Sequence, residues 1–366
     1  MKLAKGGSLL RLVAFFVIAA VLTCTASFAT SGWQSFVENE PNSDDAAAGA
    51  PSSGEVDENT DGSNSQGEIT NPEPTVKHYL TGYTISPSES GNAPISFIYS
   101  SDSPLYGISN AFLTVEIPTE GGQTRYLSLF SRGTYLGKIG SIAPTRDYIS
   151  AINKALGSML IARGGDDSFE YSDTELEYLD IIESGGYSYT EYTEFHYTNS
   201  DLVEALIKNS GQSRLLGDTV KAPFIHSDTE IRGSEAALSV IIPYSDSNGS
   251  QLIYSASEGK YTLYKGANPV RDLLNDRLCT YDNVFVLFAD ALTHETAEAT
   301  ETILDTVGGG SGYYFTRGTA IKISWATDEL GNLVFFNEHG GVLSVNVGTS
   351  YVAFEKSSRR DFLSYN

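Results

Sequence analysis

The sequence has 366 residues, which is enough for one or two folded domains. Its 40% hydrophobic residues, including 22 Tyr and 17 Phe among the aromatic and apolar side chains, can bury sizeable cores, and 35 Gly favour strands and turns over helix bundles. The formal net charge of −23 repels polyanions at long range, so no nucleic acid is expected as a partner.

The first 29 residues have the three-part layout of a secretory signal. Basic residues precede an unbroken apolar stretch from Leu12 to Leu22, and small residues then follow as far as Ala29. Cleavage after Ala29 would release the chain, whereas an uncleaved segment would anchor it. In either case the positive-inside rule places the C-terminal body outside the cytoplasmic membrane, with membrane contact through the N-terminal segment only.

Cys24 offers a third mode of attachment. Val21 and Leu22 suit a bacterial lipobox, in which the final cysteine is modified by lipid, but Thr23 stands where Gly, Ala or Ser is usual. Lipidation of Cys24, a cleaved signal and a retained anchor therefore remain alternatives.

Residues 30–76 are predicted to form a disordered acidic linker. Ten carboxylates and no Lys or Arg fall between Ser31 and Val76, and large apolar residues are almost absent after Glu38. Such a segment cannot bury enough surface to repay the entropy of ordering. Like charges and prolines extend it, so it is expected to hold the body away from the membrane.

An N-terminal mixed α/β domain is predicted for residues 77–232. Three segments mix β-branched and aromatic residues as strands do, and the turn Pro118–Gln123 makes the last two of them hairpin partners. The strands are expected at 95–99, 111–117 and 125–130.

Helical spacing follows these strands. A helix is predicted at Asp147–Leu156 and a short strand at Ser158–Ala162, an order that suggests a parallel strand pair. Two more helices are predicted at Asp173–Ile182 and Asp201–Lys208, the latter capped by Ser200 or by its own Asp201.

An aromatic run lies between these two helices. Tyr187, Tyr189, Phe195 and Tyr197 share one side if the segment is extended. The run is interpreted as a strand or hairpin that packs on the core, and an aromatic platform for sugar stacking is the alternative.

A mainly antiparallel β domain is predicted for residues 233–356, with the boundary near Ile231–Ala236 and a tail at 357–366. Short strands separated by Gly, Asn and Asp indicate a sandwich or barrel. The fold class is therefore α+β. The strands are expected at 238–242, 252–255, 261–264, 283–288, 313–316, 320–325, 333–336 and 350–354, and the glycine run Gly308–Gly312 is expected to be a loop or turn before a strand.

Motifs in both halves resemble the bacterial DUF3048 family over residues 94–354. In the first half they are Tyr106–Ala111, Glu116, Glu120–Tyr126, Lys138–Gly140 and Arg146–Tyr148; in the second they are Gly259–Tyr261, Asp282–Val284, Gly310–Gly312, Gly318, Trp325, Gly348 and Tyr351–Val352. The resemblance implies an N-terminal and a C-terminal domain at an extracytoplasmic address, and it brings no established reaction.

The sequence departs from the family pattern at three places. The family's glycine-proline stretch with two arginines is reduced to Gly140–Arg146, where only the second arginine remains. A histidine before two glycines is replaced by Arg163, and a Pro-His-Asn triplet appears as Pro223–Ile225. If those groups bind or react in relatives, this chain is a binding-only or diverged member.

The charged residues at matched positions are the candidate ligand-binding residues. Glu116, Glu120, Arg125 and Arg146, with Tyr148 beside them, could orient an anionic or glycan ligand by bidentate contacts. Alternatively, they form an ion-pair cluster that locks the hairpin to the helix. A carboxylate pair can also hydrolyse glycosides, which would make Glu116 or Glu120 catalytic.

Metal, cofactor and nucleophile chemistry have little support. The five histidines are scattered without a second ligand at helical or hairpin spacing, and no serine lies in a Gly-x-Ser-x-Gly turn. Cys279 is interpreted as a small buried apolar residue.

No metal or cofactor is expected. The predicted function is a binding or assembly factor for a cell-wall polymer or envelope protein, with a cell-wall glycan hydrolase as the alternative.

Overall fold

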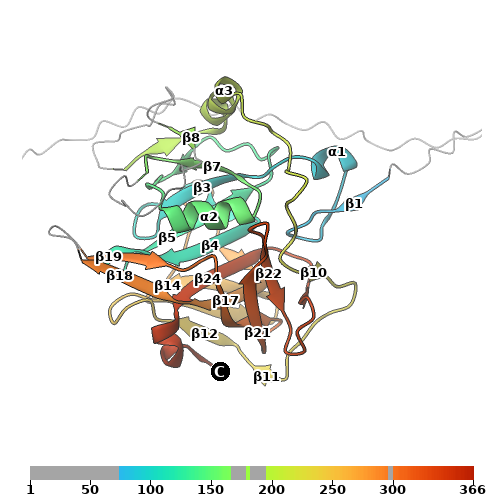
Figure 1. Cartoon of the computed structure of the whole chain (residues 1–366), viewed down its shortest axis with the longest axis vertical. Helices are drawn as coiled ribbons and strands as arrows, with labels where there is room; N and C mark the ends of the chain where they lie inside the picture. Colours follow the sequence, from blue (N-terminus) through green and yellow to red (C-terminus); the bar gives the residue numbers. More distant parts are fainter. Residues whose placement is uncertain (1–73, 166–178, 182–194, 296–299) are drawn as a thin grey trace, which may run out of the picture. The chain divides into compact units, whose positions relative to one another are not determined.

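Strands dominate the chain and helices are few (Figure 1). The computed structural model describes residues 74–165, 179–181, 195–295 and 300–366. The predicted signal, Cys24 and nearly all of the predicted linker lie outside the described residues, as do Tyr187 and Tyr189 of the aromatic run. The described residues belong to one compact unit.

The largest sheet of the described part of the chain has eleven strands and draws on both halves of the sequence. Ten strands lie side by side and β22 pairs with β21 off this path. In spatial order they are β11 (Glu235–Ala236), β21 (Thr319–Thr327), β20 (Gly309–Thr316), β17 (Asn283–Ala289), β24 (Ser350–Lys356), β4 (Leu113–Pro118), β5 (Thr124–Phe130), β3 (Ile95–Ser100), β7 (Met159–Ala162) and β8 (Leu179–Asp180), with β22 at Leu333–Phe336.

The two halves of the sequence meet inside this sheet. β24, near the C-terminus, pairs in parallel with β17 on one side and with β4 on the other. Most other neighbours are antiparallel, including the predicted hairpin β4–β5. The predicted parallel pair is present as β3 with β7, so the strand after the helix joins the first strand of the body rather than the strand just before the helix.

A second sheet covers one face of the C-terminal half. Its order is β15 (Asn268–Pro269), β14 (Lys260–Lys265), β13 (Ser250–Ser255), β12 (Ser239–Ile242) and β25 (Ser364–Tyr365), and β16 (Thr280–Tyr281) also pairs with β14. Val240, Leu252 and Leu263 share a core with Val284 and Val286 of the large sheet. Burying these side chains is the main force that holds the two sheets together.

Helices cover the N-terminal half of the large sheet (Figure 1). α2 (Asp147–Ala155) buries Ile149 and Ile152 in a core with strands β4, β5 and β7, on the face opposite the second sheet. α3 (Ser200–Ser210) buries Val203 and Leu206 in the same core as the second sheet. The third described helix is the single turn α1 (Pro87–Ser90), and the 3-10 turns are η1 (Ile108–Asn110), η2 (Glu120–Gly122) and η3 (Ser357–Phe362).

Four small strand pairs complete the described structure. They are β1 (Val76–Lys77) with β2 (Thr84–Ile85), β6 (Ile139–Gly140) with β9 (Tyr197–Thr198), β10 (Ile225–His226) with β23 (Ser344–Val345), and β18 (Ala291–Glu295) with β19 (Thr300–Leu304). Within the described ranges, no helix is both long and apolar enough to cross a membrane.

Three expectations need correction. Leu179 and Asp180 form a strand, so the helix predicted at Asp173–Ile182 is wrong at its described residues, the others lying outside the description. The cap of α3 is Asn199, whose side chain accepts the amide proton of Leu202, rather than Ser200 or Asp201.

From Gly309 onward the glycine run is strand rather than loop, whereas Gly308 lies in the bend before β20, as expected. A Cβ at Gly310 would lie 2.1 Å from the carbonyl oxygen of Phe288, and one at Gly312 would lie 2.5 Å from that of Val286. The glycines are therefore explained by the close approach of β17 and not by turn geometry.

Candidate functional site

Glu116 lies fully buried in β4, between the two sheets. Its carboxylate accepts hydrogen bonds from the hydroxyls of Thr124 (2.6 Å), Ser250 (2.6 Å) and Tyr351, and the ammonium of Lys265 lies 2.6 Å from Oε1. Burial would raise the pKa of Glu116, but Lys265 and the hydroxyl donors outweigh it and hold the pKa below its ordinary value. Glu116 is thus a satisfied anion that joins both halves of the chain.

A second buried carboxylate lies on the same face. Ala353 pairs with Glu116 in the sheet, and Glu355 is two residues further along β24, so both acids point the same way. Burial raises the pKa of Glu355 to about 8, although the amide of Lys356 donates to Oε1 and opposes the shift. Near neutral pH the buried region therefore holds one ionised and one mostly protonated carboxyl group.

The other predicted residues gather on the opposite side of the hairpin. Arg146, next to the first turn of α2, donates from Nε (3.1 Å) and from its second terminal nitrogen (3.0 Å) to both oxygens of Glu120. Arg125 donates to the carbonyl of Pro144 (2.7 Å), and Tyr148 donates to that of Pro118 (3.2 Å). These contacts lock the β4–β5 hairpin to α2.

The structure therefore separates Glu116 from the other candidates. Arg125 pairs with Ile117 across the hairpin, and neighbouring residues of a strand point to opposite faces, so Arg125 faces away from Glu116. Glu120 and Arg146 form the ion pair that the sequence offered as the alternative to a ligand site. A single cleft with two carboxylates facing two guanidiniums is not formed, because each carboxylate has its own cation.

Asp272 is a buried residue that the sequence analysis missed. Its carboxylate accepts the amide protons of Gly107 (2.8 Å) and Ser109 (2.9 Å) and the hydroxyl of Ser109 (2.7 Å). Gly107 has φ 84°, a conformation that favours glycine. The family-like motif at 106–111 thus donates hydrogen bonds to an aspartate of the C-terminal half. No local pattern marks Asp272, since its partners lie more than 160 positions earlier.

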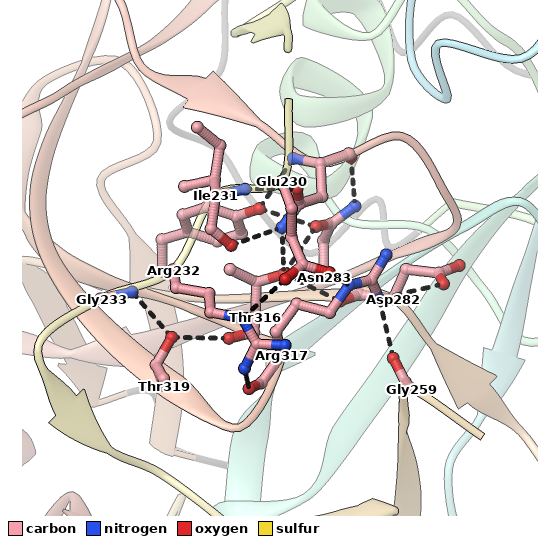
Figure 2. A network of polar contacts seen from close by, with 12 residues as sticks. Glu230, Ile231, Arg232, Gly233, Gly259, Asp282, Asn283, Thr316, Arg317 and Thr319 are labelled. Carbon is pink, nitrogen blue, oxygen red and sulfur yellow. Dashed lines mark hydrogen bonds and ion pairs between the residues drawn. The ribbon is translucent and has the colours of Figure 1, made fainter. Parts of the chain in front are cut away.

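A polar network surrounds Arg317 at the β20–β21 turn (Figure 2). Arg317 (φ 50°) and Gly318 (φ 72°) occupy the two left-handed positions of a tight hairpin turn. The guanidinium donates to the carbonyl of Gly259 (2.8 Å) and lies 3.3 Å from Glu230 and 3.7 Å from Asp282. It therefore bridges three segments that are distant in sequence.

The same network fixes the chain that leads from one half into the other. Asn346 accepts the amide proton of Ile231 (2.8 Å) and donates to its carbonyl (2.8 Å), as β-strand partners do, and it also donates to Thr316 (2.8 Å). Gly233 then presses against β21, where a Cβ would lie 1.9 Å from the carbonyl oxygen of Ala320. The backbone of segment 230–233 is therefore held in place, while the side chains of Glu230 and Arg232 remain more than half exposed.

A polar pocket of about 260 Å³ opens beside this segment. Arg232, Glu235 and Lys322 line it together with Tyr313 and Tyr365. The C-terminal strand β25 brings Tyr365 to the pocket, where its hydroxyl donates to Glu235 (2.6 Å). The sequence predicted only a tail at 357–366 and pointed to none of these residues, because the pocket forms when that segment returns to the sheet as β25.

The cysteine and the histidines of the described residues do not form a catalytic or metal-binding group. Cys279 is buried, as interpreted from the sequence, and burial raises the pKa of its thiol to about 12, which keeps it protonated. Burial lowers the pKa values of His78 and His226. In the part of the chain that the structure describes, no three His, Cys, Asp or Glu side chains are grouped to hold a metal ion.

Comparisons with known proteins agree with this architecture. Family models described as the N-terminal and C-terminal domains of a protein of unknown function, DUF3048, match residues 80–213 and 240–352. The "Putative lipoprotein YerB" of Bacillus subtilis is 19% identical over 263 residues, which cover 68% of this chain and 78% of that protein.

A solved structure shares the fold. The crystal structure of the YerB protein from Bacillus subtilis superposes with a TM-score of 0.68 at 17% identity, over 80% of this chain and 99% of that one. The similarity therefore extends through both sheets.

Proposed function

Since the chain belongs to the DUF3048 family, whose description names no activity, we propose that it is an envelope-associated binding or assembly factor outside the cytoplasmic membrane. Its ligand would be a cell-wall polymer or an envelope protein. The export-like segment at residues 1–29 supports this address, and a relative that is named a putative lipoprotein supports attachment to the envelope through Cys24 or a retained helix.

Binding is favoured over hydrolysis because both candidate carboxylates, Glu116 and Glu120, already have a cation as an internal partner. A glycosidase needs one carboxyl group with a raised pKa as the acid and a second one across the scissile bond. Glu116 has no exposed surface and a lowered pKa, and Glu120 is held by two hydrogen bonds from Arg146. Neither carboxylate is placed to protonate a glycosidic oxygen.

A combined binding and turnover assay tests the proposal. A soluble form that begins at Ile69, where the compact unit starts, would be incubated with isolated cell walls and with solubilised envelope proteins. Retention on either material without release of soluble wall fragments supports a binding factor. Release of fragments that the Glu120→Gln variant abolishes would establish the hydrolase instead.

The matched control is Glu89→Gln, a change at an acid in α1 that caps its own helix turn. Its wall retention and fragment release should equal those of the parent chain. Absence of retention on both materials would overturn the proposed function.

A further inference from the structure

The pocket beside residues 230–235 lies against a backbone segment that is held in place. It lies where the segment before β11 crosses β21, and Figure 1 draws β11, β21 and the C-terminus at the same end of the unit. Asn346 and Arg317 hold the incoming segment through the contacts described above. The backbone beside the pocket is consequently preorganised, which lowers the entropic cost of binding.

The charges that line the pocket balance. Arg232 and Lys322 contribute two cations, and Glu235 and Glu338 contribute two anions. Arg232 is held by Glu230 at 2.6 Å. Among the described residues, Lys322 and Glu338 have no ion pair, so an ammonium and a carboxylate are available to a ligand as a hydrogen-bond donor and acceptor. Balanced charges favour an uncharged polar ligand over an anion.

One wall of the pocket is aromatic. The rings of Tyr313 and Tyr365 lie 5.5 Å apart, and Phe315 supports Tyr365 from 5.3 Å. The hydrogen bond from Tyr365 to Glu235 fixes the ring's orientation. A rigid aromatic surface beside polar groups suits a ligand with one apolar face and a polar edge.

The volume limits the size of that ligand. One water molecule needs about 10–15 Å³ of such a cavity volume, so 260 Å³ gives ample room for one six-membered sugar ring with its substituents. A pyranose ring presents C–H groups on one face and hydroxyls around its edge. Its chemistry therefore matches an aromatic wall flanked by donors and acceptors.

We propose that this pocket binds one uncharged pyranose unit, a hexose or an N-acetylhexosamine, of a cell-wall glycan. The C–H face of the sugar packs on the tyrosine wall, and its hydroxyl or amide groups meet Lys322 and Glu338. The inference rests on the proposed binding function and assigns its ligand class and its place. Net charge of −23 on the chain and the balanced lining both disfavour a polyanionic glycan.

The test is calorimetric titration of the full chain in detergent with three probes. They are a linear tetramer of N-acetylglucosamine, soluble wall fragments from a muramidase digest, and polygalacturonate as an anionic glycan. Binding of the tetramer or the wall fragments and no binding of polygalacturonate are expected. Failure of both the tetramer and the wall fragments to bind, or tighter binding of polygalacturonate, would overturn the inference.

Variants locate the site. Lys322→Gln and Glu338→Gln alter exposed side chains without ion pairs and should each weaken binding about 3- to 10-fold, and Tyr365→Ala should weaken it at least 10-fold. Tyr135→Ala, at a tyrosine that is 67% exposed and does not line the pocket, is the matched control and should bind as the parent does. Circular dichroism checks that each variant is folded.

The outcomes separate the two proposals. If the parent chain and all three pocket variants bind the tetramer and the wall fragments equally, the pocket assignment is wrong while the binding function stands. If the parent chain is not retained on walls or envelope proteins, the binding function is wrong, and selective binding of the tetramer would then still identify the pocket as a sugar site.

Discussion

Replacing Lys265 by Met should destabilise the chain more than replacing Glu116 by Gln. Lys265→Met leaves the Glu116 carboxylate buried with only hydroxyl donors, and removing one partner of a buried pair typically costs about 3–5 kcal/mol. Glu116→Gln leaves the ammonium of Lys265 without its carboxylate. The Lys265 side chain is 17% exposed, and its ammonium also donates to Thr124 and Asn248. Glu116→Gln should therefore lower the unfolding free energy by about 1–3 kcal/mol.

The pH dependence has a definite sign. In the parent chain the lowered pKa of Glu116 contributes stability that is present above its ordinary value of 4.5 and is lost as the pH falls through the folded-state pKa. Without Lys265, burial dominates and the folded-state pKa of Glu116 rises above 4.5, so the variant gains stability as the pH falls. The difference between the two proteins should shrink from pH 7 to pH 4.

Urea unfolding at pH 7 and at pH 4 measures these free energies, and the double variant Lys265→Met with Glu116→Gln completes a cycle. The double variant should be more stable than the sum of the single changes predicts, because it removes the isolated charge. Equal costs for the two single changes, or additive costs, would refute the assignment of Glu116 and Lys265 as a coupled buried pair.

Three further changes test other parts of the structure. The Glu355 carboxyl, with a folded-state pKa of about 8, should make stability fall between about pH 5 and pH 8, and Glu355→Gln should flatten that slope in unfolding curves. Gly310→Ala should lower the unfolding free energy by about 3 kcal/mol or more, because the new Cβ meets the neighbouring strand. Gly91→Ala, whose Cβ would have no atom within 4 Å, should change it by less than about 1 kcal/mol, and urea midpoints measure both variants. Asp272→Ala should cost about 2–4 kcal/mol by leaving the amide protons at the start of η1 without their acceptor, and hydrogen exchange should rise there first.

Local patterns predicted most of the strands. Runs of β-branched and aromatic residues placed β17 and β22 to within a residue or so, and helical spacing placed α2. β17 is buried on both faces, whereas β22 and α2 each bury one face that their own residues define. The pairing of β24 with β4 could not be predicted in this way. Its register depends on residues more than 230 positions apart, and no short-range signal specifies such a pair.

The candidate site shows the same limit. Sequence motifs identified Glu116 and Glu120 as charged residues at matched positions, but they could not show which cation neutralises each. Lys265 and Arg146 come from different layers, and strand alternation sends Glu116 and Arg125 to opposite faces. The pocket residues were missed because Tyr365 reaches the pocket only through the pairing of β25 with β12.

The residues that carry the family resemblance mostly serve internal contacts. Gly107 and Ser109 donate hydrogen bonds to Asp272, and Glu116 joins the two sheets. Gly348 leaves room for Asp282, because a Cβ at this position would lie 2.4 Å from the Asp282 side chain. In contrast, the pocket residues Lys322, Glu338 and Tyr365 are not among these motif residues, although Lys322 and Glu338 lie within the range 240–352 that the C-terminal family model matches. The motif residues thus account for the scaffold through their internal contacts. Because they leave few groups for a ligand, the proposed pocket is best tested through Lys322, Glu338 and Tyr365 of this chain.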